Sequence, residues 1–119
     1  MAQPLHVRNC DFAQYHPLRM SSDWLWRGGI AKRVEPTYPP EAERKHLQRK
    51  ISVRVLVNGY GRVEQACGDG NRILRDAAED AALKWIFRPP KLNGETIPYI
   101  EERLDFNFVL HKANGPARR

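Results

Sequence analysis

The amino-acid sequence predicts an α+β fold of two layers, in which a three-stranded antiparallel sheet carries two helices on one face. Three observations lead to this prediction. Residues 50–58 and 97–110 alternate between apolar and polar side chains, which is the period of a strand with one buried face. Between them, residues 72–87 place apolar side chains every three or four positions, which is the period of a helix. With a shorter helix ahead of the first strand, the expected order is helix, strand, strand, helix, strand.

The first two strands form the hairpin around which the domain is organised. Residues 51–57 carry β-branched side chains at every second position, as a half-buried pleated surface prefers. Asn58-Gly59 and Gly61 provide the conformational freedom of a short turn, and residues 62–67 form the return strand. A hairpin is only marginally stable alone, so we expect the flanking segments to cover its apolar face.

Two helices are expected to provide that cover. The shorter one, at about residues 40–48, begins after Pro39 because proline suits the start of a helix, and it rests on the sheet through Ala42 and Leu47. The longer one begins after Asn71, a favourable N-cap residue, and runs over residues 72–87.

Two consequences are expected for the longer helix. It ends at Pro89-Pro90, because proline cannot donate the next backbone hydrogen bond. Its apolar stripe includes Trp85 and Phe87, which we expect to pack against Val53 and Val55 of the first strand.

The last strand is expected to form an exposed edge of the sheet. The longer helix makes a crossover connection, and the right-handed rule places the strand at 97–110 beside the first strand, in the order 2-1-3. Long edges recruit other chains, so self-association into a homodimer through this strand is one expected consequence.

The domain organisation is predicted from shifts in composition. Residues 1–27 show no sustained periodicity and are interpreted as an irregular extension, with Trp24-Leu25-Trp26 as a short piece laid on the domain surface. Residues 28–111 form the domain and residues 112–119 a basic tail. No stretch approaches the roughly 18 apolar residues of a membrane span, and the N-terminus lacks the apolar core of a signal peptide. The chain as given is therefore expected to carry no export signal and no anchor.

The chemistry-bearing residues do not predict an active site. Cys10 and Cys67 are too few for a zinc site; a single bridge is possible in an oxidising compartment, but two free thiols are favoured. The histidines lack a second ligand at metal spacing, and we expect no metal and no cofactor. Asp76, Glu79 and Asp80 are interpreted as solvated helix surface rather than a carboxylate site. We interpret the chain as a non-enzyme.

The net charge of +6 is compatible with nucleic acid, anionic lipid or an acidic protein as partner. Phe106 and Phe108 superficially suggest an aromatic platform for bases, but they alternate in phase with Leu104 and should face the core. The basic run is interpreted as solvated surface, which argues against nucleic acid as a partner; it consists of Arg44, Lys45, Arg49, Lys50 and Arg54.

Several segments, taken in order, resemble the C-terminal domain of the TonB family. Residues 36–42 resemble its P-x-Y-P-x-x-A segment, and residues 53–63 its V-x-V-x-F-x-V…G-x-V strand and turn. Residues 74–89 are similar to its L-D-x-A-A and W-x-F-x-P motifs, and residues 93–110 to its last turn and strand. The resemblance covers about residues 28–110.

The chain also departs from the family pattern at three places. Arg49 stands where the family has a glycine before the first strand, and Gly68-Asp69-Gly70 replaces a longer serine-glycine region. Glu35-Pro36-Thr37 stands where well-known members read Q-P-Q.

The resemblance implies a periplasmic domain of an energy transducer. Such a domain captures the TonB box, a short extended segment of outer-membrane transporters for siderophores and vitamins, by adding it as a strand to a sheet edge. The inner-membrane proteins ExbB and ExbD are implied partners, and an inner-membrane anchor is implied, only if the chain belongs to a longer protein. The alternative is a freestanding TonB-like accessory or sensor module without energy coupling. The candidate partner-binding residues are Glu35, Pro36, Thr37, Tyr38, Pro39, Tyr99, Ile100, Glu101, Glu102, Arg103, Leu104 and Asp105.

Overall fold

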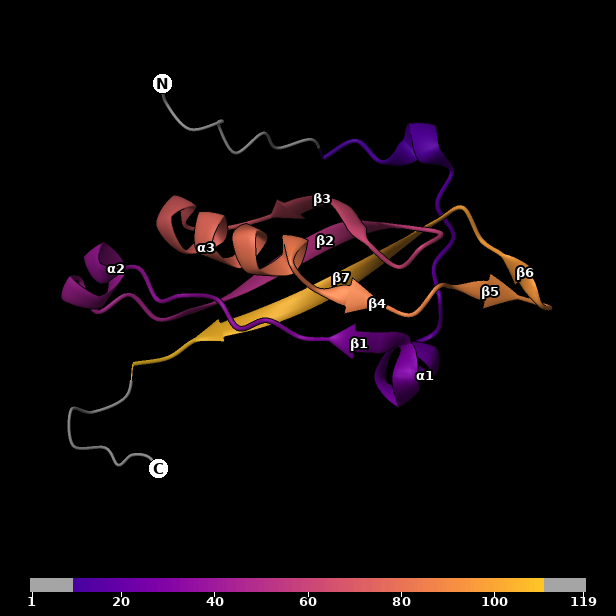
Figure 1. The fold of residues 1–119 in the computed structure, drawn as a ribbon. Helices are drawn as coiled ribbons and strands as arrows, with labels where there is room; N and C mark the ends of the chain where they lie inside the picture. The colour runs from indigo at the N-terminus through magenta and orange to yellow at the C-terminus, as the bar shows by residue number, and fades with distance from the viewer. Residues whose placement is uncertain (1–9, 111–119) are drawn as a thin grey trace, which may run out of the picture.

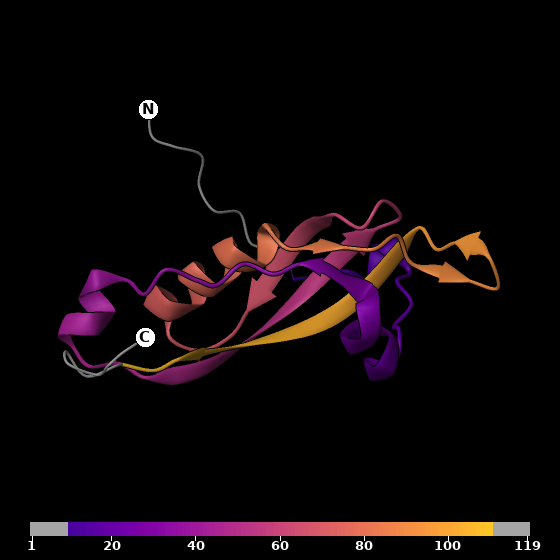
Figure 2. The same cartoon turned by 60° about the horizontal axis from the view of Figure 1, so that its bottom comes forward.

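The computed structural model describes residues 10–110 and confirms the predicted fold class. A three-stranded antiparallel sheet has the order β3-β2-β7, which is the predicted order 2-1-3 (Figure 1). Its strands are β2 (Arg49–Asn58), β3 (Val63–Gly68) and β7 (Tyr99–Phe108). The helices α2 (Pro40–Arg44) and α3 (Arg72–Leu83) accompany it, and Figure 2 shows α3 lying on one face of the sheet.

Shorter elements complete the described chain. They are the 3-10 turn η1 (Ala13–Tyr15), α1 (Ser22–Trp24), the π-turn η2 (Leu25–Gly29), β1 (Ile30–Lys32), β4 (Ile86–Phe87), β5 (Lys91–Leu92) and β6 (Glu95–Thr96). Strands β5 and β6 form a small hairpin that projects beyond the sheet (Figures 1 and 2). Its turn is Asn93-Gly94, where both residues adopt a positive φ, of 54° and 84°.

The long ladder between β2 and β7 holds the sheet together. It pairs ten residues without interruption, from Arg49 opposite Phe108 to Asn58 opposite Tyr99. Val53, Val55 and Val57 point to the α3 side and are fully buried, as their alternation predicts. Trp85 and Phe87 lie in the same buried cluster as Val53 and Val55, in agreement with the prediction.

The prediction was wrong about how the longer helix ends. Helix α3 begins at the predicted N-cap, Asn71, but it ends at Leu83, and residues 86–87 form strand β4 against β1. The reason is that tertiary hydrogen bonds replace helical ones. The Phe87 N–H donates to the Gly61 carbonyl at 2.8 Å, and the Arg88 N–H donates to the Gly29 carbonyl at 2.8 Å.

Two smaller differences concern local backbone geometry. Helix α2 is shorter than predicted, because His46 adopts a positive φ of 57° that ends it. In the β2–β3 turn, only Gly61 has the expected positive φ, at +89°, and a Cβ there would stand 1.9 Å from the Phe87 carbonyl oxygen. Gly61 therefore allows β4 to contact the turn.

The segment before Gly28 contacts the domain more closely than its composition predicts. Leu25 is 5% exposed and belongs to the core, Trp24 packs against that core, and Trp26 is 57% exposed. The interpretation of Trp24-Leu25-Trp26 as a short piece laid on the domain therefore needs one addition: its central side chain, Leu25, is buried in the core. The division of the chain at Gly28 stays a prediction, and the basic tail at 112–119 lies outside the described residues.

The expectation of two free thiols was also wrong, because Cys10 and Cys67 form a disulfide. Phe12 is the physical reason. Its ring is buried against Leu56, which lies on the sheet face opposite α3, and this contact brings Cys10 to within 5.3 Å of Cys67, measured between Cα atoms. Sequence spacing does not predict the pairing, since the two cysteines are separated by 57 positions.

Candidate functional site: the outer edge of β7

The candidate site is the edge of β7 that faces away from β2. Backbone groups in a strand alternate between its two sides, so only every second residue presents its N–H and C=O to this edge. The Leu18 N–H donates to the Tyr99 carbonyl at 3.1 Å, and the Glu101 N–H donates to the Leu18 carbonyl at 2.8 Å. The backbone groups of Tyr99 and Glu101 therefore point to the outer edge, and by alternation so do those of Arg103, Asp105 and Asn107.

This edge has two unlike halves. At Tyr99–Glu101 it is occupied by Leu18, which forms a parallel bridge with Ile100. From Arg103 to Asn107, no segment within residues 10–110 pairs with the outward backbone groups, since β7 pairs only with β2 and Leu18 there. The open half is therefore an unpaired strand edge of the kind that accepts another chain.

We call residues Cys10–Met20 the N-terminal strap. Figures 1 and 2 show it, in indigo, running along the end of the sheet at which β7 begins. It starts at the disulfide on β3, covers Leu56 through Phe12, and reaches the β7 edge at Leu18. On the way, Tyr15 and Tyr99 pack edge to face, with ring centroids 4.9 Å apart. Nothing in the sequence periodicity of this segment predicted these contacts.

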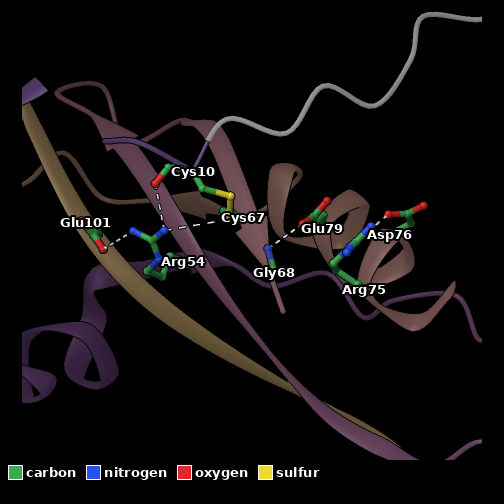
Figure 3. The surroundings of a disulfide bond; sticks show 8 residues. All are labelled: Cys10, Arg54, Cys67, Gly68, Arg75, Asp76, Glu79 and Glu101. Atoms are coloured by element: carbon green, nitrogen blue, oxygen red, sulfur yellow. Dashed lines mark hydrogen bonds and ion pairs between the residues drawn. A yellow bond between two sulfur atoms is a disulfide. The ribbon is translucent and has the colours of Figure 1, made fainter. Parts of the chain in front are cut away.

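Arg54 links the strap to β7 on the face opposite α3. Its guanidinium donates to the Cys10 carbonyl at 2.9 Å and lies 3.3 Å from the Glu101 carboxylate, as Figure 3 shows. It also lies over the Phe12 ring, 5.0 Å from the centroid. Arg54 was predicted as part of a solvated basic run, but it is the centre of a polar network that joins three segments.

A second acidic residue, Glu102, binds the last residue of the strap, Met20, at the point where the strap leaves the edge. Its side chain is 5% exposed on the core side of β7, and its Oε2 accepts a hydrogen bond from the Met20 N–H at 3.0 Å. Burial raises the pKa of the Glu102 carboxyl, although the Met20 amide and the Arg19 charge act in the opposite direction. Arg19 lies 3.7 Å from Glu101, so both acidic residues contact the strap.

The predicted site residues on β7 include both buried and exposed side chains. Ile100 and Leu104 are buried in the core, with their backbone groups turned toward β2. Arg103 and Asp105 are exposed, and Asp105 accepts a hydrogen bond from the Ser52 hydroxyl at 2.7 Å. Side chains on the open half of the edge are thus polar, and its attraction for a partner lies in the backbone.

The predicted site residues before α2 lie in a different place. Tyr38 reaches the far end of β7, where its ring meets Phe108 edge to face at 5.6 Å and its hydroxyl donates to the Leu47 carbonyl. The others line a shallow groove against α3; they are Glu35, Pro36, Thr37 and Pro39. The structure thus brings Tyr38 to β7, while its neighbours face the helix.

The interpretation of Glu79 as solvated was wrong. Its side chain is fully buried between α3 and β3, and its carboxylate accepts a hydrogen bond from the Gly68 N–H at 2.6 Å (Figure 3). A Cβ at Gly68 would stand 3.3 Å from the Glu79 Oε2, so the glycine permits this approach. This contact fixes α3 to the sheet, and a helical wheel alone cannot reveal it.

The described part of the chain presents little chemistry besides the edge. No group of three or more metal-ligating side chains occurs within it, and none of its helices is long and apolar enough to span a bilayer. Phe106 and Phe108 are buried, so the sheet presents no phenylalanine platform for bases.

A two-layer α+β domain with an open strand edge has the means to bind another protein chain by strand addition. The family model described as Gram-negative bacterial TonB protein C-terminal matches residues 34–110, and the chain belongs to this family. The resemblance inferred from the sequence motifs is thereby confirmed, and so is the interpretation as a non-enzyme, since the family is one of protein-interaction modules.

Individual relatives agree with the family assignment. The chain is 35% identical over 79 residues to Protein TonB of Xanthomonas campestris pv. campestris strain B100, and equally to that of strain ATCC 33913. The match covers 64% of this chain and only 35% of those relatives. The solution structure of the Pseudomonas aeruginosa TonB C-terminal domain superposes with a TM-score of 0.55 at 20% identity, covering 76% of this chain and 88% of that one. This last likeness concerns the fold.

Proposed function

We propose that the domain captures the TonB box of outer-membrane transporters for siderophores, vitamins and similar nutrients by adding it as a strand to the outer edge of β7. The observation that carries the proposal is the open half of that edge, where the backbone groups of Arg103, Asp105 and Asn107 point outward. A captured segment would gain affinity from backbone hydrogen bonds and selectivity from its alternate side chains. The affinity of the domain alone is expected to be modest, because an extended peptide must be ordered on binding.

The proposed compartment is the periplasm. The Cys10–Cys67 disulfide supports it, because structural disulfides persist in oxidising compartments and are rare in the cytosol. Family membership supports it as well. Within a longer anchored protein, the domain would form the transporter-facing end of an energy transducer driven by ExbB and ExbD.

A titration with a synthetic TonB-box peptide, followed by backbone amide shifts, tests the proposal. We expect the largest shifts at Arg103, Asp105 and Asn107. Replacing Arg103 by proline removes an outward N–H and should abolish binding, whereas Arg103→Ala retains that N–H and should bind almost as the wild type does. Shifts confined to residues 44–54, with β7 unaffected, would refute edge capture.

Self-association through the same edge remains a proposal. An unpaired edge pairs with its own copy as readily as with a peptide, and two open halves could form a continuous sheet across a two-fold axis. Sedimentation over a wide concentration range is the measurement. Arg103→Pro should shift the chain toward monomer if β7 mediates the contact.

A further inference from the structure

The strap already occupies part of the edge at which a peptide would be captured. Leu18 accepts from Glu101 and donates to Tyr99, which are the two backbone bonds that an incoming strand would make at this position. The open half of the edge, from Arg103 to Asn107, begins beyond Glu101. A segment of the chain therefore imitates one residue of a captured strand.

We propose that the strap is a built-in competitor for peptide capture, which limits access to the Tyr99–Glu101 half of the β7 edge until it is displaced. This inference rests on the proposed function and adds a means of regulating it. The competing group is Leu18, and its direction is parallel to β7.

Both ends of the strap are fixed, and this makes the competition effective. The disulfide holds Cys10 on β3, while Leu25, shortly after the strap, is buried in the core. Leu18 therefore cannot diffuse away from the edge, and its effective concentration stays high without any strong contact of its own. The Arg54 bridge to the Cys10 carbonyl and to Glu101 strengthens the same arrangement.

The contacts at the edge itself are few, and this makes the strap displaceable. Leu18 is 47% exposed, so only about half of the residue is buried. The Arg19–Glu101 pair spans 3.7 Å, with the Arg19 side chain 65% exposed, and exposed pairs of this kind stabilise weakly. The interactions that keep Leu18 at the edge are then mainly its two backbone hydrogen bonds and the Met20–Glu102 hydrogen bond.

The decisive variant is Leu18→Pro, with Leu18→Ala as its matched control. Both remove the leucine side chain, but only proline removes the N–H that donates to Tyr99. The disulfide and the buried Leu25, which fix the two ends of the strap, are unchanged in both variants. We expect Leu18→Pro to bind a synthetic TonB-box peptide about tenfold more tightly than the wild type, because a competitor that has lost a backbone bond is displaced at lower cost. Leu18→Ala should bind within about twofold of the wild type.

Hydrogen exchange of the Glu101 amide gives a second measurement that needs no peptide. This amide should be protected in the wild type and in Leu18→Ala, and should exchange at least about tenfold faster in Leu18→Pro. The double variant Cys10→Ser with Cys67→Ser should accelerate the same amide, because it releases one end of the strap.

The outcomes separate the two proposals. Equal peptide affinity of Leu18→Pro, Leu18→Ala and wild type would overturn the competitor role while leaving edge capture intact. Absence of binding by every variant would overturn edge capture and, with it, the competitor role. An unprotected Glu101 amide in the wild type would overturn the competitor role by itself.

Discussion

Trp85 connects three parts of the molecule, and its removal should be severely destabilising. The side chain is 4% exposed, its ring lies edge to face with Phe106 at 5.8 Å, and its indole N–H donates to the Val34 carbonyl at 2.9 Å. Truncation of a buried tryptophan to alanine costs about 3–5 kcal/mol of unfolding free energy. That is comparable to the lower end of the total stability of a small domain, about 5 kcal/mol. Trp85→Ala should therefore leave a marginally folded chain.

The substitution Trp85→Phe separates the contributions of packing and hydrogen bonding. It retains an aromatic ring but leaves the Val34 carbonyl without its donor, which should cost about 1–2 kcal/mol. Trp26→Ala is the matched control. The Arg33 guanidinium lies over both indole rings, 5.6 Å from the Trp85 centroid and 5.5 Å from the Trp26 centroid, but Trp26 is 57% exposed. Trp26→Ala should therefore cost less than about 1 kcal/mol.

Urea denaturation followed by far-ultraviolet circular dichroism is the appropriate assay, since it does not depend on the tryptophans as probes. We expect the midpoints in the order Trp26→Ala, Trp85→Phe, Trp85→Ala, from highest to lowest. If Trp85→Ala lost less than about 1 kcal/mol, the assignment of Trp85 as the residue that joins segment 30–34 to the core would be refuted.

Three further perturbations give distinct expected results. Replacing Cys10 and Cys67 by serine opens a 57-residue loop and should lower the unfolding free energy by up to about 4 kcal/mol, measured by urea titration; no change in midpoint would contradict this. Gly61→Ala should lower the melting temperature far more than Gly94→Ala, because both positions have positive φ but only at Gly61 does a Cβ meet backbone, at 1.9 Å; equal effects would show that φ alone matters. The raised pKa of Glu102 means that the folded state binds its proton more tightly than the unfolded state, so the wild type loses stability as the pH rises from about 4.5 through that raised pKa. Glu102→Gln should remove this loss, so its stability gain over the wild type should be present at neutral pH and vanish below about pH 4.5, as thermal melts over a pH series would reveal.

The sheet and its order could be predicted because period and connection rules act locally. The alternation at 51–57 specifies a buried face, and the right-handed crossover specifies where β7 lies. The end of α3 could not be predicted in this way. The apolar spacing continues through Trp85 into Phe87, and the tertiary hydrogen bonds from Phe87 to Gly61 and from Arg88 to Gly29 show that this stretch leaves the helix.

The candidate site was predicted only in part, for a similar reason. The position of β7 at an edge of the sheet follows from topology. The occupation of that edge by Leu18 depends on the packing of Phe12 against Leu56 and on the disulfide that accompanies this contact. Such contacts join segments that are distant in sequence, and they carry no period of their own. The buried Glu79 shows the same limit, because the hydrogen bond that it accepts comes from the Gly68 backbone N–H, and a pattern of side chains does not indicate a backbone donor.

The uninterrupted ladder between β2 and β7 has a mechanical consequence. Its ten residue pairs run antiparallel along the whole length of both strands. A tensile load applied along the axis of β7, such as a strand added to its edge would transmit, acts on these hydrogen bonds in shear, so that they resist together. A load applied across the strands would instead open the ladder one pair at a time. The domain should therefore withstand pulling along the sheet much better than peeling from its end, which single-molecule force spectroscopy with attachment at two alternative pairs of sites can measure.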